Sequence, residues 1–149
     1  MSDVVPSQAL QDSVATLVAA GSILSPATNK FRLVKSAFTP SPATVPADYT
    51  VADFTGSAAL VTATVAVYTD PTTGLQEIRP APPVGGLKWS PTDATNLPQT
   101  IYGFVFTDTT AATVIGSALL PTPIVLTAAG QLIDIGAPVF RLPLNPLGP

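Results

Sequence analysis

The chain of 149 residues contains neither cysteine nor histidine. Without cysteine the fold cannot rest on disulfides, and metal sites built on thiolates are excluded. Without histidine the chain lacks the commonest general base and the commonest metal ligand of proteins. Ser-His and Cys-His catalytic arrangements and zinc sites are therefore excluded, and we expect neither a metal nor a cofactor.

Charged residues are scarce as well. They make up 10% of the chain and hydrophobic residues 46%, whereas an average soluble domain has about 25% charged residues. With a formal net charge of −3, copies of the protein repel one another only weakly, so we expect this surface to pack against other subunits. Lys30, Arg32 and Lys35 fit solvated groups on a strand better than a phosphate-binding cluster, so nucleic acid is not an expected partner.

Long hydrophobic runs are also missing. No apolar run in the sequence approaches the roughly 20 residues that a membrane-spanning helix needs, so no membrane span is expected. The first residues, MSDVVPSQ, carry Asp3 in place of a basic region and are not followed by an apolar segment with a cleavage site. We therefore expect no secretory signal peptide and synthesis in the cytoplasm.

The N-terminal residues 1–25 contain the one segment with a helical pattern. Pro6 and Ser7 are suited to open a helix, and Gly21 is suited to end it. The apolar residues between them recur at the spacing of a single helical face: Leu10, Val14, Leu17 and Val18. This face is a candidate subunit contact, although it could also fold back on the rest of the chain.

Residues 26–142 have the pattern of short antiparallel strands, because the turn residues Pro, Gly, Thr and Asp separate runs of β-branched and aromatic residues. About nine strands are expected at 30–37, 58–69, 75–79, 87–90, 100–107, 113–120, 124–127, 131–135 and 139–142. The turn residues DPTTG at 70–74 predict a hairpin between the second and third of these. The expected fold is therefore mainly β, an antiparallel β-sandwich of jelly-roll-like form, with the short helix in front of it.

The segment TIYGFVF predicts a central strand because both of its faces are apolar. One face carries Tyr102, Phe104 and Phe106, and the other carries Ile101, Gly103 and Val105. Gly103 leaves a notch in which another layer, such as the N-terminal helix or a bulky side chain from the facing sheet, could approach closely.

Proline marks the segments that are poor strands. Residues 38–50 and 79–86 carry three prolines each and are expected to be loops. The C-terminal segment 143–149 has proline at every third position, Pro143, Pro146 and Pro149. This spacing fits a polyproline II arm that places Leu142, Leu144 and Leu147 on a neighbouring subunit, and a frayed tail is the alternative.

Carboxylates are the only remaining candidates for catalysis. A glycosidase would need two of them facing each other across a cleft. Asp48, Asp53, Asp70 and Asp93 lie in or beside turns, where aspartate accepts hydrogen bonds from nearby backbone N–H groups. Asp134, between two isoleucines, is expected to point outward from a strand. We therefore expect no enzymatic activity, and a carboxylate hydrolase is the least favoured function.

Two aromatic residues are candidate ligand contacts. Tyr49 and Trp89 could stack on sugars if they are exposed. For Trp89, the one tryptophan of the chain, a lid over the end of the sandwich core is the favoured interpretation, and sugar binding is the minor hypothesis.

The order of motifs resembles that of a known group of proteins. These motifs are the strand KFRLVKSAFTP, the loop ending in ADYTVADFTG, a long Ala/Val/Thr strand and NLPQTIYGFVFTD. Over residues 24–142 the chain is similar to small, largely uncharacterised proteins encoded among the virion genes of bacteriophages. Its sharpest pieces are Asp53-Phe54-Thr55-Gly56 and the QTIYGF segment at 99–104. The resemblance implies a structural β-domain on a capsid, spike or fibre.

Taken together, the sequence predicts a non-enzymatic virion structural protein that forms a homo-oligomer or docks on other capsid proteins. The expected subunit contacts are the apolar residues of the two terminal segments, Leu10, Val14, Leu17, Leu142, Leu144 and Leu147. The alternative is a module that binds a surface glycan or a host receptor through Tyr49 and Trp89.

Overall fold

The computed structural model describes residues 5–6, 29–61, 64–69, 71–72, 76–81, 86–108, 110–138 and 140–141. This part of the chain is mainly β, and all of its strand pairs are antiparallel, as expected from the sequence. The strands are β1 Val5–Pro6, β2 Lys30–Val34, β3 Leu60–Val61, β4 Thr64–Thr69, β5 Gln76–Ala81, β6 Lys88–Trp89, β7 Gln99–Thr107, β8 Val114–Leu126, β9 Ile133–Asp134 and β10 Phe140–Arg141. One short 3-10 helix, η2, spans Pro46–Asp48.

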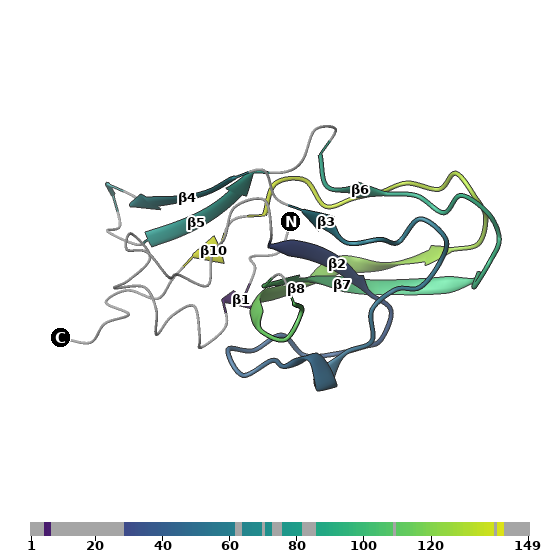
Figure 1. Ribbon diagram of the computed structural model, residues 1–149, viewed down its shortest axis with the longest axis horizontal. Coiled ribbons are helices and arrows are strands. Elements are labelled where there is room, and N and C mark those ends of the chain that lie inside the picture. Colours follow the sequence, from purple (N-terminus) through teal and green to yellow (C-terminus); the bar gives the residue numbers. More distant parts are fainter. Residues whose placement is uncertain are drawn as a thin grey trace.

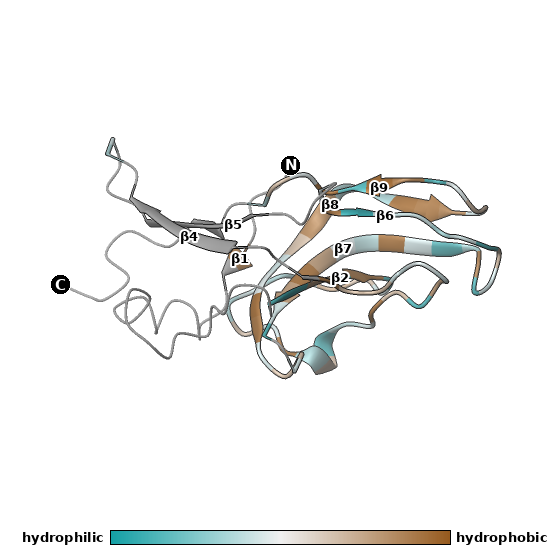
Figure 2. Cartoon of the chain, turned by 45° about the horizontal axis from the view of Figure 1, so that its top comes forward, coloured by the Kyte–Doolittle hydropathy of each residue, from teal (hydrophilic) through white to brown (hydrophobic). Residues whose placement is uncertain are grey.

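The strands form three sheets. A five-stranded sheet has the order β1-β8-β7-β2-β3, a three-stranded sheet the order β10-β5-β4, and β6 pairs with β9 (Figure 1). Figure 2 shows β6 and β9 running side by side across from β7 and β2 of the large sheet. The chain therefore places a short ribbon opposite the face of the large sheet.

The core lies between the large sheet and the β6–β9 ribbon. On the sheet side, Phe31 of β2 lies opposite Phe106 of β7, and their rings stack with centroids 4.4 Å apart. Phe104 adds a tilted contact to Phe31 with centroids 6.0 Å apart. From the ribbon come Trp89 and Ile133, and all five side chains are at most 2% exposed. Burying each of them stabilises the fold by roughly 1.5–3 kcal/mol.

Strand β7 is central, as predicted, because β8 and β2 flank it and both of its faces are buried from Gly103 to Thr107. The predicted faces are wrong in one respect, since Ile101 and Phe104 contribute to the same core. A register shift against β8 between Ile101 and Gly103 interrupts the alternation of side chains. A Cβ atom at Gly103 would collide with the carbonyl oxygen of Ala118 on β8. The close approach at Gly103 therefore comes from the neighbouring strand of the same sheet and not from another layer.

Strand β8 replaces two predicted strands, 113–120 and 124–127, with one of 13 residues. The expected interruption is still visible in its pairing, because residues 120–123 of β8 lie opposite Tyr102 alone. Pro121 and Pro123 fall in this bulge, where the ladder needs no N–H donor from them. The prolines therefore bend the strand without ending it.

The predicted strand at 58–69 is divided between two sheets. β3 pairs with β2, whereas β4 pairs with β5 through the predicted hairpin, which is confirmed. β5 extends to Ala81, so three residues of the expected loop at 79–86 belong to this strand. Pro80 is accommodated in β5 because β10 pairs only with Glu77 and Ile78, so the described strands flank Pro80 on one side alone. The loop expected at 38–50 is confirmed and contains only η2.

The structure describes only residues 5–6 of the N-terminal segment and none of the C-terminal segment 143–149. Pro6, expected to open the helix, instead pairs with Gly116 in β1, an edge position that tolerates its missing N–H. The remainder of the predicted helix and the predicted C-terminal arm lie outside the described residues. The candidate subunit contacts Leu10, Val14, Leu17, Leu142, Leu144 and Leu147 fall in these segments.

Candidate functional site

A polar pocket lies beyond the end of β2, where β7 continues past its last pair with that strand, Val34 opposite Gly103. Residues from three segments line it: Lys35, Asp53, Asn96, Pro98, Gln99, Thr100 and Tyr102. The pocket is an open depression of about 440 Å³. It combines the first residue after β2, the loop that follows residue 50, and the start of β7.

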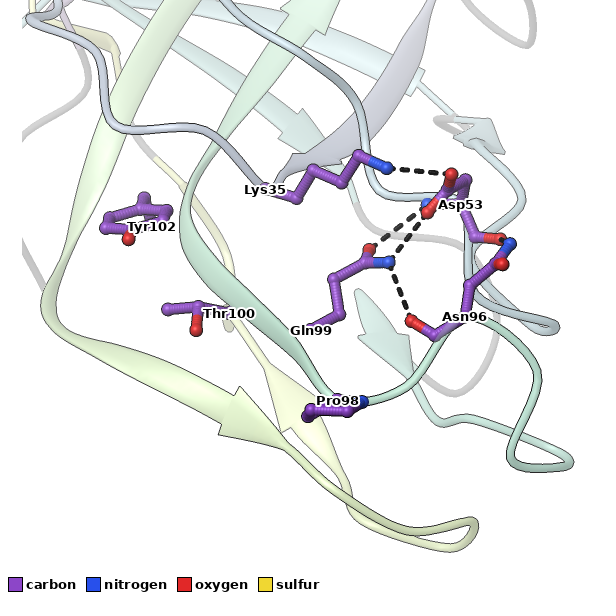
Figure 3. Close-up of a pocket in the computed structure, with 7 residues that line it drawn as sticks. All are labelled: Lys35, Asp53, Asn96, Pro98, Gln99, Thr100 and Tyr102. Atoms are coloured by element: carbon purple, nitrogen blue, oxygen red, sulfur yellow. Dashed lines mark hydrogen bonds and ion pairs between the residues drawn. The ribbon is translucent and has the colours of Figure 1, made fainter.

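Hydrogen bonds in this pocket converge on Asp53 (Figure 3). The Lys35 Nζ atom lies 2.7 Å from Asp53 Oδ2. The Gln99 side chain donates from Nε2 to Asp53 Oδ1 at 2.6 Å and accepts the Asp53 backbone N–H on Oε1 at 3.1 Å. Asn96 donates from Nδ2 to the Asp53 carbonyl oxygen at 2.9 Å. Three side chains thus hold one residue of the loop against β7.

The Asp53 carboxylate is ionised and stabilised in that form. Its pKa lies below the ordinary value of 3.8, chiefly because Lys35 and then Gln99 donate hydrogen bonds to it. The side chain is 52% exposed, so solvent screens the ion pair and reduces its contribution to stability. A carboxylate held in this way is a weak base, and this favours a structural role over proton transfer.

Other groups in the pocket are open to solvent. Figure 3 shows Thr100 and Tyr102 on the other side of the β7 ribbon from Gln99, as their alternation along a strand requires. Both are partly exposed. The polar network and the Tyr102 ring therefore belong to different faces of the same strand.

The network joins two segments that are far apart in the sequence. Asp53 begins the DFTG segment, and Gln99 begins QTIYGF. They are 46 residues apart in the sequence. From the sequence, Asp53 was expected beside a turn and Lys35 as a solvated group, but the ion pair between them was not predicted. The signal that could have revealed the contact is a glutamine at the start of an otherwise apolar strand.

A second pocket surrounds Tyr49, one of the predicted ligand contacts. It has a volume of about 360 Å³ and is lined by Arg32, Pro46, Tyr49, Thr50, Val51 and Ala111. The Tyr49 ring contacts Phe38 in a tilted arrangement with centroids 6.0 Å apart. Burial raises the pKa of the Tyr49 phenol above its ordinary value of 10.0, while Arg32 lowers it and Asp48 raises it by smaller amounts. The phenol is therefore protonated at neutral pH.

Trp89, the other candidate ligand contact, belongs to the core, which is the position favoured for it from the sequence. Its side chain is 2% exposed, and its indole N–H donates to the Ala58 carbonyl oxygen at 2.9 Å. A ring in this position is not presented to a ligand at the surface. The structure thus separates the two aromatic residues and leaves Tyr49 as the one beside a pocket.

Most of the described aspartates cap turns, as predicted. Backbone N–H groups donate to the carboxylates of Asp48, Asp93, Asp108 and Asp134. The Thr95 N–H lowers the pKa of Asp93 in this way. Asp134 is exposed, as expected, and Lys88 Nζ lies 3.9 Å from its carboxylate. Lys88 lies opposite Asp134 because β6 and β9 are paired.

Comparison with protein-family models, curated proteins and solved structures gives no significant match to the chain. Among the residues that the structure describes, no three acidic side chains gather into a metal-binding group. In the same residues no helix has both the length and the hydropathy needed to cross a membrane.

Proposed function

We propose that this protein is a non-enzymatic virion structural protein that assembles with copies of itself or docks on a capsid, spike or fibre. Its fold would be a jelly-roll-like β-sandwich. The core shared by the large sheet and the β6–β9 ribbon supports two layers. The placement of β7 beside β2, far apart in the sequence, fits the long connections of such folds.

The observation that carries the proposal is that β8 and the turn after it have no charged residues and expose several apolar side chains. Residues 109–133 contain no charged side chain. Within them Leu119, Val125 and Leu132 are 38%, 53% and 59% exposed. Beyond β1, which pairs only with Gly116 and Ser117, the described strands leave the outer edge of β8 uncovered. A surface of this composition loses little by desolvation when another subunit covers it.

A charge placed on this surface tests the proposal. We expect the purified protein to sediment at a multiple of 15.2 kDa and the double variant Val125→Lys/Leu132→Lys to sediment at or near the monomer mass. Both positions are exposed, so the variant should keep the circular dichroism spectrum of the parent protein. Val45→Lys is the matched control, because Val45 is 49% exposed but belongs to the loop before η2 and not to β8 or the turn after it.

Two results would contradict the proposal. If the parent protein stays monomeric at all concentrations, the self-assembly part of the proposal is wrong. Docking on a capsid would then be tested by mixing the protein with purified capsids. An oligomer that both double and control variants leave intact would show that β8 is not the contact. The terminal leucines would then be the remaining candidates, tested by deletion of residues 145–149.

A module that binds a surface glycan or host receptor is the second candidate function. The pocket beside Tyr49 favours it, since a half-buried phenol borders a cavity with both polar and apolar walls. A glycan array read with the parent protein and with Tyr49→Ala tests it, and equal signals would count against it.

A further inference from the structure

We propose that the pocket between β2 and the 46–51 segment binds a sugar residue that bears a carboxylate, with Arg32 as the group that recognises the anion. This inference gives a ligand class to the second candidate function, on which it rests. It does not depend on the assembly proposal, because the pocket and the exposed edge of β8 are formed by different residues.

The first support is that Arg32 has no carboxylate partner in the described part of the chain. Arg32 alternates with the core residues Phe31 and Leu33 along β2, so it points to the opposite face of the sheet and lines the pocket. Its guanidinium forms no ion pair with any carboxylate in the described part of the chain. Lys30 lies two residues away on the same face and adds a second positive charge.

The carboxylates near this pocket are already engaged. Asp48, which borders Tyr49, accepts the Val45 backbone N–H at 2.9 Å through Oδ2. Asp108, at the end of β7, accepts the Thr113 backbone N–H at 3.2 Å and the Thr110 hydroxyl. Asp48 lessens the positive potential of the pocket but does not bond to Arg32. A ligand carboxylate therefore meets an arginine that has no competing intramolecular partner in the described residues.

The second support is an unsatisfied donor. The Arg32 Nε–H group is buried and has no hydrogen-bond acceptor among the residues that the structure describes. Buried polar groups without partners are uncommon in proteins, because each loses its hydration without compensation. A carboxylate binds guanidinium most favourably side-on, with one oxygen on Nε and the other on a terminal nitrogen. Because Nε is buried, this mode requires the guanidinium to turn toward the pocket, where Nε would gain an acceptor that the described residues do not supply.

The walls of the pocket indicate what carries the carboxylate. Pro46, Val51 and Ala111 offer apolar surface, while Tyr49 and Thr50 offer hydroxyl groups. The raised pKa of Tyr49 keeps its hydroxyl protonated and able to donate. A sugar ring presents C–H faces to the first set and hydroxyls to the second, and about 360 Å³ accommodates a ligand of that size. A peptide carboxylate would use Arg32 but leave the hydroxyl groups of the pocket without partners.

The test follows the Arg32 Nε–H resonance in the ¹⁵N spectrum of the full chain, which has three arginines. The signal is assigned by its loss in Arg32→Lys. Sodium glucuronate, N-acetylneuraminate, glucose and N-acetylglycine are titrated separately at constant ionic strength. We expect an acidic sugar to shift the Arg32 signal and the amides of residues 49–51 and 111 in a saturable way. The two acidic sugars separate a hexuronate from a sialic acid as the source of the carboxylate.

Two variants and one control test which groups of the pocket bind the acidic sugar. Arg32→Lys keeps the charge but removes the planar fork, and we expect it to weaken binding of the acidic sugar by about tenfold or more. Tyr49→Phe removes one hydroxyl and should weaken binding by a smaller factor while leaving the fold intact. Lys88→Gln is the control, because it removes a positive charge from β6, away from the pocket, and should leave binding unchanged.

Three outcomes would overturn the inference. Equal shifts with glucose and glucuronate would show that the carboxylate is not recognised. Tighter binding of N-acetylglycine than of either acidic sugar would assign the pocket to a peptide carboxylate. The absence of any saturable shift in the folded parent protein would show that the pocket binds none of these ligands. The oligomeric state, measured on the same samples, tells such a failure apart from a failure of the assembly proposal.

Discussion

Replacing Gln99 with methionine tests whether the Asp53 network fixes the loop after residue 50 to β7. Methionine keeps the length of the side chain but removes all hydrogen bonding. The change deletes one bond to a charged oxygen at 2.6 Å, one bond from the Asp53 backbone N–H at 3.1 Å and one to the Asn96 carbonyl oxygen at 3.2 Å. Gln99 itself is 8% exposed, so the loss falls on a largely buried side chain.

The expected magnitude follows from these bonds. A bond to a charged group contributes about 1.5–3 kcal/mol and a neutral one about 0.5–1.5 kcal/mol. Water can replace part of both terms here, because Asp53 and Asn96 are exposed. We therefore expect Gln99→Met to lower the free energy of unfolding by about 2 kcal/mol, which corresponds to a decrease in Tm of roughly 4–8 °C for a chain of this length.

The assay is denaturant unfolding followed by Trp89 fluorescence and by circular dichroism, with Gln131→Met as the matched control. Gln131 also accepts bonds from backbone N–H groups, those of Thr127 and Ala128, but within one exposed turn. We expect the control to cost at most about 1 kcal/mol, since water replaces these bonds. A Gln99→Met protein as stable as the control would refute the view that this network holds the loop in place.

Three further predictions concern the same structure. The pKa of Asp53 is lower in the folded than in the unfolded protein, so its ion pair with Lys35 stabilises the fold above the ordinary pKa of 3.8. This contribution is lost as the pH falls through the lower folded pKa. The unfolding free energy of Asp53→Asn should therefore depend less on pH in the acid range than that of the parent protein, as denaturant titrations at several pH values would show. Gly103→Ala places a Cβ atom against the Ala118 carbonyl oxygen and should lower the free energy of unfolding by about 2 kcal/mol or more. In Gly130→Ala the Cβ atom meets open space at φ +87°, so only the left-handed backbone should lower it, by about 1 kcal/mol. Equal melting temperatures for the two variants would contradict this order. The emission of Trp89 should be blue-shifted and unaffected by added sugars, since the ring is buried in the core; a sugar-dependent change in the spectrum would return Trp89 to the list of ligand contacts.

Local patterns in the sequence were sufficient to locate most of the described strands and turns, although not all of their boundaries. Alternating β-branched and aromatic residues marked β7 as central, since a strand buried on both faces needs apolar residues at successive positions. Aspartates were assigned to turns because the carboxylate reaches backbone N–H groups only a few residues away, as at Asp93 and Asp134. Prolines at 121 and 123 marked an irregularity, although the strand continues through it as a bulge.

The candidate site was less accessible to such reasoning. Asp53 and Gln99 are 46 residues apart, and nothing near either of them in the sequence specifies the other. Arg32 has the pattern of an ordinary solvated residue on a strand, and its buried, unsatisfied Nε appears only when the loop at 46–51 packs beside it. The residues next to Trp89 in the sequence do not show by themselves whether its ring is buried or exposed.

The sequence by itself determined that this chain forms short antiparallel strands joined by proline-rich loops and aspartate-capped turns, because those choices depend on neighbours within a few residues. Only the tertiary structure decided that β3 and β4 enter different sheets, that Ile101 shares a face with Phe104, and that Lys35 and Gln99 meet at Asp53. Strand pairing, register shifts and long-range contacts depend on how distant segments pack together. A pattern of period two specifies a strand but does not name its neighbour.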